Sequence, residues 1–113
     1  MGLTVEQAAL GGDTTLTAQI DQEAGGREWD VTVLISRPAD QPPIRPGDVG
    51  VRLLDGEGRA LRAVAQPSSP WAEAGGSAGT TANGTFRFAA GASEPERLQV
   101  TWKGAVTTLR VSR

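Results

Sequence analysis

The chain of 113 residues has no cysteine and no histidine. Without cysteine it has no disulfide and no thiolate nucleophile. Without histidine it has no imidazole base and lacks the usual nitrogen ligands of zinc, copper and haem. These absences remove most familiar enzyme mechanisms and metal centres. The sequence therefore predicts a protein that is not an enzyme and that has no cofactor and no metal site.

Charge and long apolar runs are also scarce. The 11 basic and 13 acidic residues give a net charge of −2, and the isoelectric point is about 5.0. Such a chain has no strong cationic field to attract phosphates, so we expect no nucleic-acid partner. No apolar run reaches the roughly 18 residues of a membrane span, and residues 1–13 lack the basic and apolar stretches of an export signal.

What the sequence does contain is alternation of apolar and polar residues with a period of two, between segments rich in Gly, Pro, Asn and Asp. This pattern is typical of short strands with one apolar face. Such faces are covered only by a second sheet or by closure of a barrel. We expect an all-β sandwich of about seven strands with Greek-key connections, and an up-and-down barrel as the alternative. Its single domain spans residues 14–113, after an N-terminal extension over residues 1–13.

The clearest strand runs from Glu28 to Ser36. Leu34 interrupts its polar side, next to Thr32, so this strand is either central or has an outer face that meets a partner. An earlier strand is predicted from Thr14 to Asp21. The side chains predicted to point inward from the clearest strand are Trp29, Val31, Val33 and Ile35.

Two hairpins can be derived from their loops. In the first hairpin, a three-residue loop, Gly56–Gly58, is the length that does not bury a charged side chain. This loop pairs Leu53 with Leu61 and Val51 with Ala63. It also requires a positive φ at Gly58. A two-residue turn at Lys103-Gly104 places nearly every apolar residue of the last hairpin on one face. The pairs expected there are Trp102 with Ala105, Val100 with Thr107, and Leu98 with Leu109.

The remaining segments are interpreted as connections. Pro38–Gly47 contains four prolines and cannot pair within a sheet. Residues 66–82 form the longest predicted loop, and Asn83-Gly84 is a strong signal for a two-residue turn. Asn83 also begins an N-glycosylation pattern, but the turn is the favoured interpretation.

Several segments together resemble bacterial immunoglobulin-like β-sandwich domains. The Trp on the second predicted strand is followed by VRLLDGEGRAL in the middle of the chain and by GTFRFAAG and ERLQVTWKGAVTTLRV near its end. The resemblance covers most of Thr14–Arg113. The antibody-type cysteine pair and the tyrosine corner have no counterpart, because the chain has neither residue. The resemblance implies an extracellular, cell-surface or periplasmic module for adhesion, spacing or assembly.

Candidate sites are few. Trp71 on the long loop and Trp102 beside a turn are aromatic side chains that could contact a ligand or partner, and Thr32 and Leu34 could form a packing surface. Asp55 to Gly58 carries two carboxylates, but a hairpin turn is favoured over a calcium site. The carboxylate pairs available for acid-base catalysis are interpreted as solvated surface charge; they are Glu28 with Asp30 and Glu94 with Glu96.

The sequence thus favours a non-catalytic immunoglobulin-like module of a secreted, surface or periplasmic bacterial protein. Its partner would be another protein or the other domains of its parent chain, which it contacts or spaces apart. The alternative is a carbohydrate-binding module that uses Trp71 as a stacking platform.

Overall fold

The structure, a computed structural model, describes residues 2–11, 13–22, 25–38, 49–64, 80–91 and 94–112. These residues form eight strands and no helix, and every strand pair is antiparallel, so the all-β prediction is confirmed. The strands are β1 (Gly2–Val5), β2 (Ala8–Gly11), β3 (Thr14–Gln22), β4 (Glu28–Arg37), β5 (Val49–Asp55), β6 (Thr80–Ala89), β7 (Pro95–Trp102) and β8 (Ala105–Ser112).

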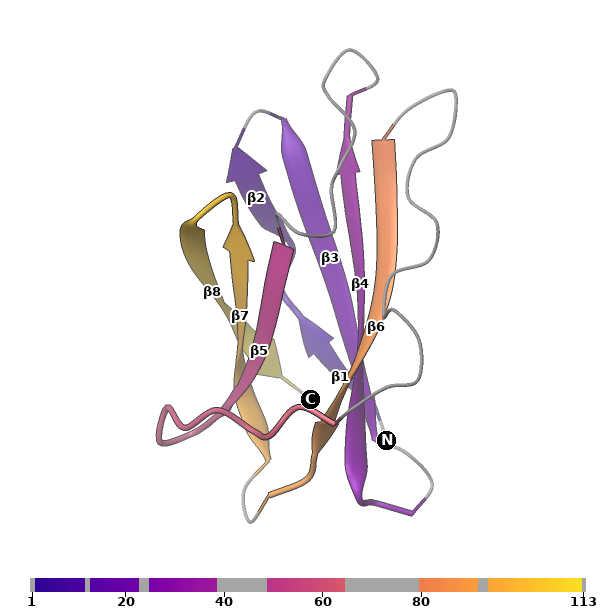
Figure 1. The fold of residues 1–113 in the computed structure, drawn as a ribbon, viewed down its shortest axis with the longest axis vertical. Helices are drawn as coiled ribbons and strands as arrows, with labels where there is room; N and C mark the ends of the chain where they lie inside the picture. The colour runs from indigo at the N-terminus through magenta and orange to yellow at the C-terminus, as the bar shows by residue number, and fades with distance from the viewer. Residues whose placement is uncertain are drawn as a thin grey trace.

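The strands follow the order β5-β7-β8-β1-β3-β4-β6, and β2 pairs with β3. Figure 1 shows β5, β7 and β8 side by side on the left and β3, β4 and β6 on the right. Strand β1 joins the two groups, because it pairs with β3 and, through Thr4 and Val5, with β8. Neighbours in this order are often distant in sequence, so the chain is not a simple up-and-down barrel.

The two outermost strands, β5 and β6, are linked by the segment that follows β5. Ala60 pairs with Leu54 of β5, and Ala63 pairs with Phe88 of β6. The backbone N–H of Val64 donates to the carbonyl oxygen of Arg87 at 2.9 Å. These contacts make the sheet nearly closed and barrel-like.

Pairing begins before residue 14. The sequence predicts an extension over residues 1–13, but Gly2–Val5 and Ala8–Gly11 form β1 and β2 and lie along one edge of β3. The side chain of Leu3, opposite Ile20, is buried. Burial of this side chain accounts for the position of β1 within the sheet.

The core lies between the inward faces of the strands, as the alternation predicts. Strand β4 is central, between β3 and β6, and all four of its predicted inward side chains are buried. Leu34, on its other face, is exposed. The largest fully buried apolar side chains are Leu16, Ile20, Val31, Val33, Ile35, Leu53, Leu98 and Val100.

The last hairpin has the predicted register. Its three expected pairs all form, and Val106 is the exposed exception on β8. The turn residues Lys103 and Gly104 have φ values of 49° and 86°. These left-handed conformations match the twist of a tight hairpin, and glycine adopts them without strain.

The β5 hairpin is only half of what the sequence predicts. Leu61 donates its N–H to the carbonyl oxygen of Leu53 at 2.8 Å, and Gly58 has a φ of 84°, as expected. The predicted pair of Val51 with Ala63 is wrong, because Val51 pairs with β7 and Ala63 with β6. After Ala60 pairs with Leu54, the chain turns away from β5, and Ala63 pairs with β6 at the opposite edge of the sheet.

The predicted turn at Asn83-Gly84 is also wrong. Both residues lie within β6, where Asn83 pairs with Leu34 and Gly84 with Val33. Strand β6 pairs with β4 along its whole length, and this long ladder overrides the local turn preference. The connections expected over Pro38–Gly47 and residues 66–82 lie largely outside the described residues; within them, Thr80–Ala82 belongs to β6.

Candidate functional site

A surface without charged side chains covers part of the outer side of β3, β4 and β6. Because β4 lies between the other two strands, its outward side chains stand in rows with theirs. One row joins Thr17, Leu34 and Asn83. We call this row, together with the row on each side of it, the neutral face. Its nine residues are Thr15, Thr17, Gln19, Thr32, Leu34, Ser36, Thr81, Asn83 and Thr85.

Leu34 stands at the centre of the neutral face and is 40% exposed. It lines a shallow depression together with residues 17–19 and Thr32. Within the next row the hydroxyl oxygens of Thr32 and Thr85 lie 3.5 Å apart. The face is therefore an array of hydroxyl and amide groups around one apolar side chain.

Charge begins at the row beyond the neutral face. There Asp21 pairs with Asp30, and Asp30 pairs with Arg87. Oδ1 of Asp30 lies 3.5 Å from Nε of Arg87. This row marks one end of the uncharged area and brings one acidic side chain close to a basic one.

The structure brings together two of the predicted contact residues, Thr32 and Leu34, on adjacent rows. The sequence pattern does not reveal the contribution of β6, because Asn83-Gly84 favours a turn. The signal is present in the sequence: Thr81, Asn83 and Thr85 alternate with buried residues of the same strand. Recognising it requires knowing that β6 is the neighbour of β4.

Trp102 lies away from the neutral face and is only 7% exposed. The guanidinium carbon of Arg37 is 5.5 Å from the ring centroid, and the Lys103 ammonium is 5.4 Å from it. Both cations are within the range of a cation–π contact. The ring thus offers little open surface to a ligand. Trp71 lies outside the described residues.

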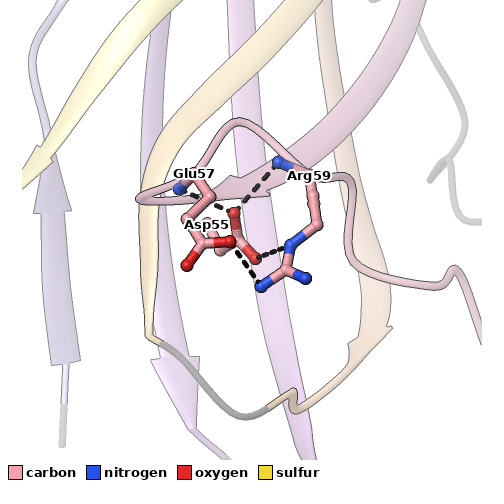
Figure 2. Close-up of polar contacts among 3 residues, drawn as sticks. All are labelled: Asp55, Glu57 and Arg59. Atoms are coloured by element: carbon pink, nitrogen blue, oxygen red, sulfur yellow. Dashed lines mark hydrogen bonds and ion pairs between the residues drawn. The ribbon is translucent and has the colours of Figure 1, made fainter.

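The acidic loop after β5 is held together by its own groups (Figure 2). Oδ1 of Asp55 accepts hydrogen bonds from the backbone N–H groups of Glu57 and Arg59, each at 2.9 Å. Nε of Arg59 lies 3.3 Å from Oδ2 of Asp55, and its Nη2 lies 2.8 Å from Oε2 of Glu57. Both carboxylates are engaged in closing the turn, which is the role that the sequence favours.

These contacts also set the acidity of Asp55, which is 6% exposed. The hydrogen bond from the Arg59 N–H holds the pKa of the Asp55 carboxyl below its ordinary value. Desolvation raises the pKa, but the Glu57 N–H and the positive charge of Arg59 lower it further. The carboxyl group is thus stabilised in its ionised form.

Within the described part of the chain, no group of three or more acidic side chains is arranged so that it could hold a metal ion. Glu94 and Glu96 border a depression of about 160 Å³, which is below the roughly 300–1,000 Å³ of typical ligand pockets. Glu28 and Asp30 lie on the outer side of β4.

Comparison of the chain with family models, with curated proteins and with solved structures gave no match in any of the three. The described residues contain no helix of the length and apolar character needed to span a membrane.

Proposed function

We propose that this chain is a non-catalytic immunoglobulin-like module, with Greek-key connections, of a secreted, surface or periplasmic bacterial protein. It makes protein contacts through the neutral face or holds neighbouring domains apart. The observation that carries the proposal is the exposed Leu34 at the centre of an uncharged array on three paired strands.

The composition of the neutral face supports a contact role. The central parts of protein interfaces are depleted in charged residues, because a charge that loses its water without gaining a partner costs free energy. The neutral face has no charge to desolvate. Its hydroxyl and amide groups can donate and accept hydrogen bonds at the same time.

The size of the face indicates which kind of contact it makes. Three strands about 4.8 Å apart and three rows about 6.7 Å apart cover roughly 290 Å². A standard stable interface buries about 800 Å² on each partner. The neutral face alone is too small for a stable association of free molecules. It suits contact with another domain of the parent chain, because a covalent link supplies a high effective concentration.

The experiment is site-specific photocrosslinking in the full-length protein in its native cells. A photoreactive amino acid at position 34 is expected to form an adduct with a neighbouring domain or protein. The same group at position 57, on the exposed β5 turn, is the control and is expected to form none. Absence of an adduct at position 34 contradicts the contact role.

The carbohydrate-binding alternative depends on Trp71, since the Trp102 ring is buried. It predicts a change of tryptophan fluorescence on titration with glycans, and loss of that change in Trp71→Ala. A flat response to a glycan panel would remove this alternative.

A further inference from the structure

The outer side of β5, β7 and β8 carries three arginines, one on each strand: Arg52, Arg97 and Arg110. Arg97 pairs directly with Arg110, and their chain neighbours Leu98 and Leu109 are buried, so both arginines point outward. All three side chains are exposed. We call this surface the arginine face.

The three arginines of the arginine face have no ion-pair partner among the described residues. Two acidic residues beside the arginines contact them through backbone groups and not through ion pairs. Oε1 of Glu6 accepts the backbone N–H of Arg110 at 3.1 Å, and Arg97 donates to the backbone carbonyl of Glu96 at 3.2 Å.

This arrangement opposes stability. Like charges directly opposite each other on antiparallel strands repel. The Arg97–Arg110 pair is such an arrangement, in a chain whose net charge is −2. A partner that brings negative charge to this face would remove the repulsion.

We infer that the arginine face binds an acidic segment of a partner protein. Each guanidinium can hold a carboxylate through two parallel hydrogen bonds. Apolar side chains adjoin the arginines: Leu54 stands opposite Arg97, and Val106, which is 58% exposed, lies further along β8 on the same side as Arg110. A segment with both carboxylates and apolar side chains matches this mixture.

Other anionic partners match the face less well. Nucleic-acid binding commonly neutralises roughly six to ten phosphates, and three arginines cannot do so. Acidic polysaccharides and anionic lipid headgroups supply negative charge but no apolar side chain for Val106. The inference concerns β5, β7 and β8, which do not carry the neutral face, so it goes beyond the proposed function and is independent of contacts at Leu34.

The test uses the chain and a fluorescently labelled short peptide that alternates Glu and Val, at low salt and at about 0.15 M salt. Anisotropy is expected to show binding that weakens with salt. Replacing both Arg97 and Arg110 by Gln is expected to weaken binding about tenfold or more.

Arg62→Gln, which removes one positive charge from the segment after β5, is expected to leave binding unchanged. Leu34→Lys, on the neutral face, is also expected to leave it unchanged.

Matched probes identify the partner class. A peptide with Lys in place of Glu is expected not to bind, and one with Gly in place of Val is expected to bind more weakly. Equal binding by the Arg97→Gln/Arg110→Gln variant would overturn the inference. Tighter arginine-dependent binding of alginate, or of vesicles rich in phosphatidylserine, would overturn the assignment to a protein segment.

Discussion

The Arg37 guanidinium lies 5.5 Å from the centre of the Trp102 ring. Arg37 ends β4 and Trp102 ends β7, so the contact joins a strand of one group to a strand of the other. Strands β4 and β7 are not neighbours in the sheet. This side-chain contact therefore links the two groups of strands without any backbone hydrogen bond between β4 and β7.

Loss of this contact is expected to destabilise the fold. Arg37→Met keeps the aliphatic stem and removes the charge, and a cation–π contact contributes about 0.5–1 kcal/mol at sites of this kind. A double-mutant cycle with Trp102→Leu isolates the pair. Urea unfolding is expected to give a coupling free energy of about 0.5–1 kcal/mol. A coupling free energy of zero would show that the two side chains do not interact.

The turn at Gly104 gives a prediction with an internal control. Gly104→Ala places a Cβ at a φ of 86°, and we expect a loss of about 1–2 kcal/mol in the free energy of unfolding. Gly50→Ala adds the same methyl group in β5, where its Cβ would lie 3.5 Å from Cβ of Thr101, an ordinary contact. We expect Gly50→Ala to be neutral or stabilising. Equal destabilisation by both would contradict the assigned turn.

Stability is expected to depend on pH through Asp55. Its folded-state pKa is lowered below the ordinary value of 3.8, so its contribution is complete above about pH 5 and is lost as the pH falls through the folded-state pKa. Melting temperatures measured from pH 6 down to pH 2 should fall less for Asp55→Asn than for the parent chain. Glu57→Gln, on the exposed side of the loop, is the control. An identical pH profile for Asp55→Asn and the parent would refute this role.

The arginine face predicts a variant that is more stable than the parent. Arg110→Thr removes the charge opposite Arg97 and places a residue suited to strands, so we expect a gain of about 0.2–1 kcal/mol. The gain should shrink in about 1 M salt, where charges are screened. Chemical unfolding at low and high salt measures it. A loss of stability in Arg110→Thr would show that the arginine pair is not repulsive.

The features predicted correctly from sequence are those that local pairing determines. The β7–β8 hairpin follows from a turn and an alternation that agree, and Leu53 pairs with Leu61 because three loop residues separate the strand ends. The errors lie where distant segments compete. Ala63 leaves β5 for β6, and Asn83 is held within β6 by pairing with Leu34.

The candidate faces likewise depend partly on local sequence and partly on which distant strands pair. Thr32 and Leu34 could be assigned to an outer face because alternation alone places them there. The rows that they form with β3 and β6, and the opposition of Arg97 and Arg110, depend on which strands are neighbours. The sequence specifies only the opposition of Arg97 and Arg110, because it follows from the register of the β7–β8 hairpin.

The neutral face exists only if β4 pairs with β6 in the register found. The natural chain has no cysteine, so one disulfide can test this pairing directly. Thr32 and Thr85 are partners whose hydroxyl oxygens lie 3.5 Å apart. Their replacement by cysteine is expected to give an intramolecular disulfide on mild oxidation without loss of the β-sheet circular-dichroism signal.

A control pair of cysteines at Thr32 and Thr107 is expected to give no disulfide. Failure of the first pair to close, or equal closure of the control, would contradict the strand order from which both the neutral face and the proposed contact role are derived.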